Sequence, residues 1–241
     1  MRFNTKDERL IVALDVPTQE RATKLVRALK DHAGYFKVGL QLFTAAGPAV
    51  IRKILQEETK VFLDLKLHDI PNTAAQAAVE AARLGVHMMT LHTLGGEAMM
   101  RQTRETLQGS SQREGWPIPK LLGVTILTSM DQTTLSSVGI EHPLDAEVLH
   151  LAKCAQRAGL DGIVSSPHEL GLFRQVGLHG LLFVTPGIRS STSAGDDQAR
   201  TMTASQALAE GADYLVVGRP IIQAPDPVRA AQAILEEIHL G

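Results

Sequence analysis

The segment 61–73, VFLDLKLHDIPNT, places ionisable side chains inside an apolar run. Asp64 and Lys66 alternate with leucines, and the period of two that a strand imposes puts both on one face, with Cα atoms about 6.5 Å apart. A buried strand seldom carries unpaired charge, because desolvating an isolated ion costs several kcal/mol. Asp69 is an odd number of residues from Asp64, so it does not share that face, and we expect it at the strand end or in the following loop. Its side chain can therefore point away from Asp64 and Lys66, for example toward a neighbouring subunit.

Two further ionisable residues belong to apolar runs. Lys37 occurs within YFKVGL, and Asp15 ends LIVALD. If these runs are neighbouring parallel strands, two carboxylates and two ammonium groups meet at one end of the sheet. Such an array suits proton transfer at carbon, because flanking carboxylates keep a buried lysine protonated and able to act as a general acid. The alternative interpretation is a structural salt-bridge network that closes this end of the sheet.

Arginines follow two later apolar runs, in FVTPGIRS and LVVGRPI. Arg189 and Arg219 can hold a phosphate dianion through forked hydrogen bonds, and Gly218 lets a ligand oxygen approach the backbone. Gln198, at the start of the next predicted helix, adds a neutral donor. Two arginines on the surface without a ligand are the alternative, but their shared position after these two runs favours phosphate binding.

These residues sit on a repeating pattern of short apolar runs, each followed by a stretch with helical character. The runs are almost continuously apolar, as strands buried on both faces of a parallel sheet are. Eight runs in 241 residues predict an α/β fold, a (β/α)8 TIM barrel that forms a single domain over residues 1–241. The predicted strands are Leu10–Asp15, Tyr35–Leu40, Val61–Leu67, His87–His92, Lys120–Leu127, Gly162–Ser166, Leu181–Gly187 and Tyr214–Gly218.

A doubly wound open sheet is the alternative arrangement, although no Gly-x-Gly-x-x-Gly follows the first run. In a barrel, the charged residues fall at the carboxyl ends of strands, where active sites are built, and the arginines follow strands seven and eight, where phosphates often bind. Thr18 and Asp226 are predicted to cap the first and last helices. The segments Thr128–Pro143 and Ile188–Asp197 are predicted to be long loops, and the composition of the second suits a mobile lid.

The overall composition argues against several classes of protein. With 24 Lys and Arg against 26 Asp and Glu, the net charge of −2 is unlike that of a general nucleic-acid binder. No apolar run reaches the ~18 residues of a membrane helix. The single cysteine, Cys154, fits a reducing compartment, so we expect a cytoplasmic protein. His87 and His92 face opposite sides of one predicted strand, so no metal site is expected.

Together these motifs resemble the orotidine 5′-phosphate decarboxylase family, in its short bacterial form, over essentially the whole chain. The Asp-x-Lys-x-x-Asp core is shared with related sugar-phosphate decarboxylases, whereas its continuation His-Asp-Ile-Pro-Asn-Thr and the two arginine segments are more specific. The matching segments are LIVALD, FKVGLQLF, FLDLKLHDIPNT, VTILTSM, TPGIRS and VVGRPI.

This resemblance implies a complete set of properties. The expected fold is a (β/α)8 barrel, and the expected assembly is a homodimer with shared active sites at the interface. The implied reaction converts the small-molecule nucleotide orotidine 5′-monophosphate to uridine 5′-monophosphate and carbon dioxide, the last step of de novo pyrimidine synthesis. No metal or organic cofactor, nucleic acid or membrane takes part.

By the same resemblance, the charged residues acquire catalytic roles. Lys66 donates the proton to C6 of the pyrimidine as the carboxylate leaves. Asp64, near the substrate carboxylate, and Asp69 flank this lysine, with Asp69 contributed by the partner subunit. Lys37 completes the charged chain.

The resemblance also assigns contacts with the substrate. Lys37 and Asp15 hold the ribose hydroxyls, and Thr73 reaches a ribose across the interface. Thr128 lies on the loop that meets the pyrimidine. The expected phosphate ligands are Arg189, Gln198 and Arg219, with backbone contact from Gly218.

Two other functions account for part of the pattern. A sugar-phosphate decarboxylase or aldolase of the same barrel type shares the Asp-x-Lys-x-x-Asp core but typically needs magnesium, so metal dependence separates it from the first hypothesis. A non-catalytic nucleotide-binding protein would bind uridylate and turn over nothing. The combination of two lysines with three acidic residues argues against this last interpretation.

Overall fold

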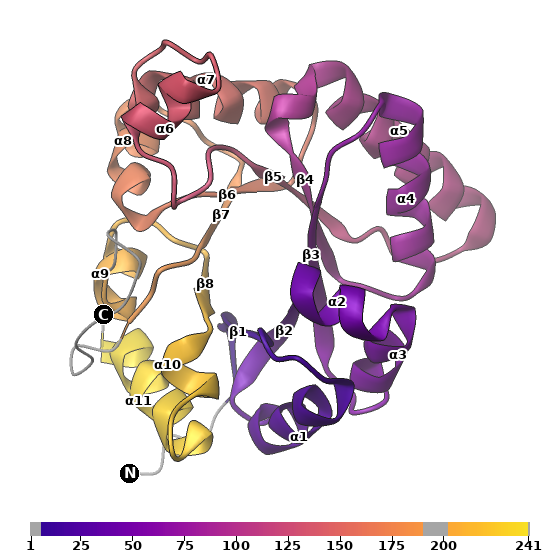
Figure 1. Ribbon diagram of the computed structural model, residues 1–241, viewed down its shortest axis with the longest axis vertical. Helices are drawn as coiled ribbons and strands as arrows, with labels where there is room; N and C mark the ends of the chain where they lie inside the picture. Colours follow the sequence, from indigo (N-terminus) through magenta and orange to yellow (C-terminus); the bar gives the residue numbers. More distant parts are fainter. Residues whose placement is uncertain (1–5, 190–201, 241) are drawn as a thin grey trace.

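The computed structural model describes residues 6–189 and 202–240, and in this part of the chain eight parallel strands close into a barrel (Figure 1). Each strand pairs with the next along the chain, and β8 pairs back onto β1. This closure confirms the predicted (β/α)8 barrel and excludes an open sheet. The strands are β1 (Asp7–Ala13), β2 (Ala33–Gly39), β3 (Lys60–Leu67), β4 (Met88–His92), β5 (Lys120–Val124), β6 (Gly162–Val164), β7 (Leu182–Thr185) and β8 (Tyr214–Val217).

Every predicted strand is present, but several end earlier than expected. Asp15 lies two residues beyond the end of β1, and Leu127 lies three residues beyond the end of β5. Both residues were included in strands because the apolar run continues past the last paired residue. At the carboxyl end of the barrel the backbone no longer pairs with the neighbouring strands. Asp15 and Leu127 therefore belong to the loops that form the mouth of the barrel.

A ring of helices surrounds the strands (Figure 1). The α-helices are α1 (Gln19–Leu29), α2 (Leu40–Ala46), α3 (Pro48–Leu55), α4 (Pro71–Arg83), α5 (Gly96–Glu114), α6 (Gln132–Ser137), α7 (Leu144–Arg157), α8 (Leu170–Gln175), α9 (Ala204–Ala209), α10 (Arg219–Ile222) and α11 (Pro227–Leu240), and the 3-10 helices are η1 (Thr93–Gly95) and η2 (Pro167–Glu169). Within the described ranges, none of these helices is long and apolar enough to cross a membrane.

The predicted caps of the first and last helices are confirmed. Thr18 Oγ1 accepts a hydrogen bond from the Arg21 amide, and Asp226 Oδ1 accepts from the amides of Val228 and Arg229. These bonds satisfy amides that the first turn of a helix otherwise leaves without a partner.

Two apolar layers hold the barrel together. The larger layer lies between the strands and the helices. The smaller layer fills the barrel interior with alternate residues of the strands: Ile11, Ala13, Tyr35, Phe62, Met88, Leu122, Val184 and Val216. At the amino end of the barrel, the rings of Tyr35 and Tyr214 meet edge to face with their centroids 5.7 Å apart.

On three neighbouring strands, the residues that face the interior become polar toward the carboxyl end of the barrel. Two residues further along their strands, on the same face, Tyr35 is followed by Lys37, Phe62 by Asp64 and Met88 by Thr90. On β2, β3 and β4 the barrel interior therefore changes from apolar to polar side chains where these strands approach the mouth.

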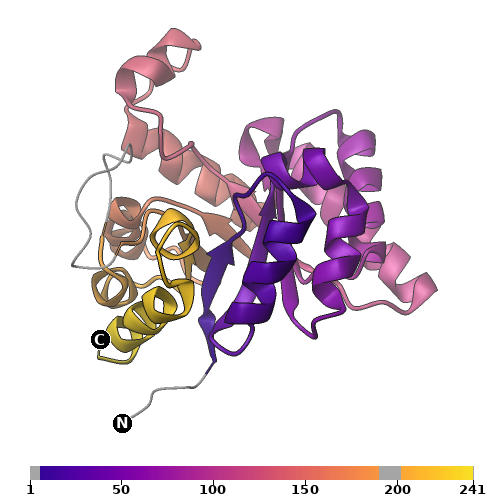
Figure 2. The same ribbon diagram turned by 60° about the horizontal axis from the view of Figure 1, so that its bottom comes forward.

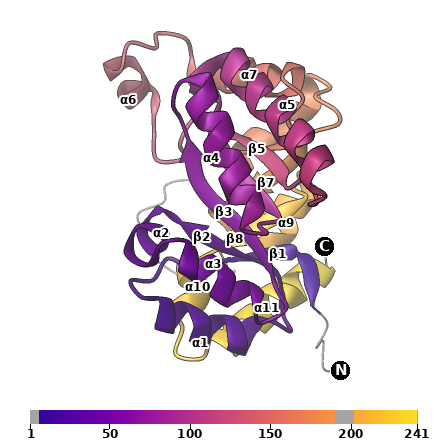
Figure 3. The ribbon, with the colours of Figure 1, turned by 90° about the vertical axis from the view of Figure 1, so that its right-hand side faces the viewer.

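The long segment after β5 departs from the predicted loop. Residues 132–137 form the short helix α6, because Asp131 Oδ1 accepts hydrogen bonds from the amide and hydroxyl of Thr134 and starts a helical turn. The segment projects from the body of the barrel (Figure 2, Figure 3). Most of the second predicted loop, from residue 190 onward, lies outside the described residues.

The barrel leaves no room for a side chain at Gly162 on β6. A Cβ there would approach the carbonyl oxygen of Leu182 to 2.4 Å, so the backbone would have to shift. We expect Gly162→Ala to lower the free energy of unfolding by about 1–3 kcal/mol, measured by denaturant titration. Gly109→Ala is the matched control, because a Cβ on α5 would meet only the flexible end of Arg113. It should stabilise the protein by about 0.5–1 kcal/mol, and equal effects of the two substitutions would contradict this account.

Candidate active site

A cavity of about 280 Å³ opens at the carboxyl ends of the barrel strands. Residues from strands on opposite sides of the barrel line it. Its polar lining includes Asp15, Lys37, Asp64, Lys66, Thr128, Arg189 and Arg219, with Gly218 at the start of α10. The structure therefore brings together most of the predicted site residues, although they are as far apart in the sequence as Asp15 and Arg219.

Four side chains form a continuous chain of alternating charge. Lys37 Nζ lies 3.2 Å from Asp15 Oδ1 and 3.4 Å from Asp64 Oδ2. Lys66 Nζ lies 2.9 and 3.0 Å from the two carboxylate oxygens of Asp64. Gly39 leaves space for this arrangement, because a Cβ at that position would lie 3.0 Å from Lys37 Nζ. Each lysine is thus held in place by at least one carboxylate.

Asp64 is the more enclosed of the two carboxylates in this row of charges, with 9% of its surface exposed. Burial alone would raise its pKa, but the ammonium groups of Lys37 and Lys66, together with hydrogen bonds from Lys66 and Thr90, bring the pKa below its ordinary value. Asp64 is therefore ionised at neutral pH, and its negative charge lies between the ammonium groups of Lys37 and Lys66.

The backbone of β3 is distorted where it carries Lys66. Leu63 pairs with Met89 and Leu67 with Leu91, so three residues of β3 lie opposite Thr90 alone. Lys66 has a φ of +51°, a backbone conformation that residues other than glycine rarely adopt. Irregularities of this kind are common beside active sites, where they redirect a side chain.

Sequence reasoning missed Thr90. Its hydroxyl donates to Asp64 Oδ1 and accepts from the Lys66 amide, both at 2.9 Å. The signal that indicates Thr90 in the sequence is a hydroxyl at an inward-facing position of MMTL, the otherwise apolar first four residues of β4.

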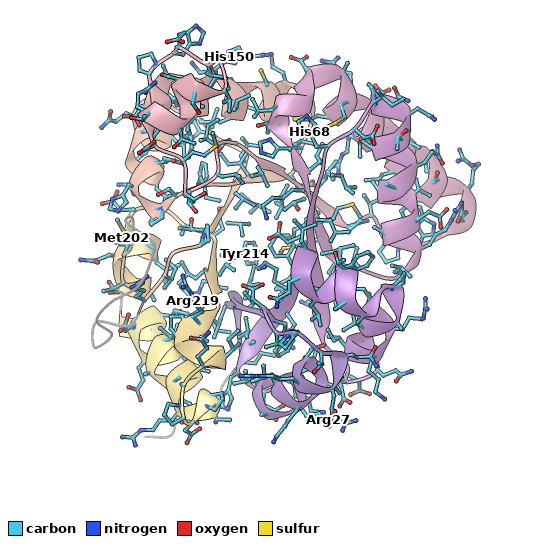
Figure 4. All side chains as sticks on the ribbon, in the orientation of Figure 1. Arg27, His68, His150, Met202, Tyr214 and Arg219 are labelled. Atoms are coloured by element: carbon cyan, nitrogen blue, oxygen red, sulfur yellow. The ribbon has the colours of Figure 1, made fainter. Side chains whose placement is uncertain are left out.

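The opposite side of the cavity carries the two predicted arginines. Arg189 follows β7 and Arg219 opens α10, with Gly218 immediately before it. Figure 4 shows Arg219 and His68 on opposite sides of the barrel. The cavity thus has a cationic end and an end of alternating charge. The predicted phosphate ligand Gln198 lies outside the described residues.

Asp69 and Thr73 do not line the cavity of their own chain. Both are exposed, and Asp69 Oδ1 accepts a hydrogen bond from the Ile70 amide. Thr73 lies inside α4, which starts at Pro71. Asp69 therefore follows the charged strand without joining the chain of charges that Asp64 and Lys66 form.

Two histidines stack beside this strand end. The rings of His68 and His92 are 5.4 Å apart at an angle of 23°. Burial, with smaller contributions from His68 and Lys66, lowers the pKa of His92 to about 4, so this ring is neutral at neutral pH. Among the described residues, no group of three or more His, Cys, Asp or Glu side chains is arranged to hold a metal ion.

The fold and the cavity define a (β/α)8-barrel enzyme with an alternating lysine–aspartate array at the carboxyl ends of its strands. The family described as "Orotidine 5'-phosphate decarboxylase / HUMPS family" matches residues 8–234. The chain belongs to this family, as its motifs indicated.

Individual relatives agree with this assignment over nearly the full length. An orotidine 5′-phosphate decarboxylase of Geotalea daltonii is 50% identical, and the match covers 98% of this chain and 100% of the relative. That of Moorella thermoacetica is 47% identical, covering 100% and 95%. The crystal structure of the Lactobacillus acidophilus orotidine 5′-phosphate decarboxylase has a TM-score of 0.84 at 39% identity, covering 96% of this chain and 99% of that one.

The lowered pKa of Asp64 makes its contribution to stability depend on pH. A carboxylate with a lowered folded-state pKa stabilises the protein above its ordinary value of 3.8, and this contribution is lost as the pH falls through the lowered value. The free energy of unfolding of the wild type minus that of Asp64→Asn should therefore decrease as the pH falls from about 5 through 3.8. Denaturant titrations at several pH values measure this difference.

Asp31→Asn is the control for this experiment, since Asp31 is an exposed aspartate outside the site. Its difference from the wild type should vary much less with pH. A difference for Asp64→Asn that is constant across the same range would contradict the electrostatic account of the site.

Proposed function

We propose that this protein decarboxylates orotidine 5′-monophosphate to uridine 5′-monophosphate and carbon dioxide in pyrimidine biosynthesis, in the cytoplasm. The observation that carries the proposal is the chain of charges Asp15–Lys37–Asp64–Lys66 in a cavity that also has two arginines. Relatives with about 50% sequence identity are named orotidine 5′-phosphate decarboxylase, which supports this proposal against a magnesium-dependent sugar-phosphate decarboxylase.

The two ends of the cavity suggest how the nucleotide binds. In the proposed complex, Arg189 and Arg219 hold the phosphate through charge-assisted hydrogen bonds, with the Gly218 backbone close to an oxygen. Gln198 is proposed as a further phosphate ligand. Asp15 and Lys37, which are already paired, hold the ribose hydroxyls. This arrangement leaves the pyrimidine between Thr128 and Lys66.

The proposed chemistry is a proton transfer coupled to the loss of carbon dioxide. The bond between C6 and the carboxylate carbon breaks, its electron pair stays on C6, and carbon dioxide leaves. The Lys66 ammonium group stabilises the developing negative charge and gives its proton to C6, after which the neutral amine regains a proton from solvent. Asp64 holds this ammonium group in place, because both of its oxygens contact Lys66 Nζ.

Binding energy at the phosphate contributes to this reaction at a distance. The phosphate is remote from the bond that breaks, so contacts with Arg189 and Arg219 do not change during the chemical step. Such contacts can offset the cost of ordering the site and desolvating the reacting groups. The arginines are therefore proposed to affect turnover as well as affinity.

Lys66→Ala removes the proposed acid and should abolish detectable turnover of orotidylate while the protein remains folded. The assay follows the loss of substrate ultraviolet absorbance, with circular dichroism as the check on folding. Wild-type turnover should be unchanged by a metal chelator, whereas loss of activity with chelator would favour the magnesium-dependent alternative. A wild type that binds uridylate in calorimetry but converts no orotidylate would be the non-catalytic binding protein.

We also propose a homodimer with shared active sites. Asp69 is exposed and outside the cavity of its own chain, and its neighbour Ile70 is 68% exposed. Leu40, at the start of α2, and Leu94, in η1, are also exposed. These three apolar side chains follow the adjacent strands β2, β3 and β4 at one end of the barrel, which suits a protein interface. In the proposed dimer, the partner subunit's Asp69 and Thr73 reach the cavity.

Mixing two inactive variants tests the shared site. Lys66→Ala and Asp69→Ala should each be nearly inactive alone. If Asp69 acts across the interface, each mixed dimer has one intact site and one doubly altered site, so a randomly exchanged equimolar mixture should recover about one quarter of wild-type activity. Sedimentation should show a dimer. No recovery after verified subunit exchange would place Asp69 in its own subunit's site, and an active monomer would contradict the dimer.

A further inference from the structure

Thr90 connects the last two members of the charged array, Asp64 and Lys66. It lies in the middle of β4 with 1% of its surface exposed. Its Oγ1 donates to Asp64 Oδ1 and accepts from the backbone amide of Lys66, both at 2.9 Å. We infer that Thr90 is a positioning residue, which fixes the carboxylate of Asp64 and the backbone of Lys66 relative to each other; its effect on turnover rests on the proposed decarboxylation.

The strand irregularity explains why a side chain is needed there. Between the pairs Leu63–Met89 and Leu67–Leu91, β3 has two more residues than β4, and the strands are out of register. Lys66 lies in this stretch with a positive φ. A non-glycine residue keeps such a conformation only where its surroundings hold it. The hydroxyl of Thr90 satisfies the Lys66 amide at this position and so stabilises the distorted backbone.

The direction of the two bonds makes the hydroxyl specific. A hydroxyl has one proton, and here that proton points to the carboxylate of Asp64, which leaves a lone pair for the Lys66 amide. A methyl group in the same place offers neither. The amide and one carboxylate oxygen would then each lose a partner in a buried setting, which is costly.

Thr90 supports the array without belonging to the cavity surface. It is absent from the cavity lining, whereas Asp64 and Lys66 line the cavity and contact each other directly. The arginines that are proposed to bind phosphate follow β7 and β8, away from β4. Loss of the hydroxyl should therefore misplace the proton donor without removing a contact to the nucleotide, and the rate of the chemical step should fall more than affinity.

The test compares Thr90→Val, Thr90→Ser and the wild type. Thr90→Val keeps the shape and removes the hydroxyl, and should lower kcat by about 10–100-fold. KM and the dissociation constant for uridylate, from calorimetry, should change by less than about threefold, since no nucleotide contact is lost. Thr90→Ser restores the hydroxyl and should return kcat to within about threefold of the wild type.

Thr103→Val is the matched control. Thr103 is also fully buried, and its hydroxyl donates to the Met99 carbonyl inside α5, outside the site. The same substitution should leave kcat within about twofold of the wild type, even where it lowers the melting temperature. An equal loss of kcat in both valine variants would show a general effect of removing a buried hydroxyl and would overturn the inference.

Hydrogen exchange at the Lys66 amide gives a measurement that does not depend on activity. The amide should exchange at least about tenfold faster in Thr90→Val than in the wild type, because it loses its acceptor. Thr90→Ala answers the same question if the valine variant does not fold.

An inactive wild type would contradict the proposed decarboxylation, and the exchange rate would still decide the role of Thr90. An active wild type with unchanged kcat and unchanged exchange in the variants would overturn the inference about Thr90 alone.

Discussion

The site depends on one ionised carboxylate held between two ammonium groups inside the barrel. A charge buried without a partner is costly, because burial removes it from water. Asp64, Lys37 and Lys66 offset this cost for one another, because each charge lies within 3.4 Å of an opposite one. The placement of the proposed acid is thus a property of the group and not of Lys66 alone. Asp15 at the outer end, half exposed, connects the group to solvent and to the region proposed for the ribose.

The barrel supplies what these charges need. On β2, β3 and β4 an apolar residue faces the interior and a polar one follows two positions later, so these strands form a boundary between the apolar core and the polar side chains of the array. Apolar side chains below the boundary exclude water and keep the electrostatic interactions strong. Because β8 pairs with β1, the closed barrel brings Gly218 next to Asp15 and Arg219 into the same cavity, whereas an open sheet with this strand order would leave β1 and β8 at opposite edges.

The sequence was sufficient for the fold and for most of the cavity lining, for a physical reason in each case. Buried parallel strands have apolar runs that are easy to see, and a charge inside such a run needs an explanation, which led to Lys37, Asp64 and Lys66. The failures are at positions where local pattern and tertiary structure disagree. Strand ends were placed too late because apolar character continues into the mouth. The helix α6 was missed in a segment read as loop. The positive φ of Lys66 and the role of Thr90 arise from the mismatch between β3 and β4, which neither strand shows separately.

The packed interior also makes the cavity a dead end. Phe62 and Met88 fill the barrel below the array, and the rings of Tyr35 and Tyr214 close its amino end. Within residues 6–189 and 202–240 the axis is closed by these side chains, so in the proposed enzyme substrate and product both pass between the loops at the carboxyl ends of the strands. Occupancy by either one blocks the other. In the proposed enzyme, product and substrate therefore compete for the same cavity, and the residence time of the product sets the earliest moment at which the next cycle begins.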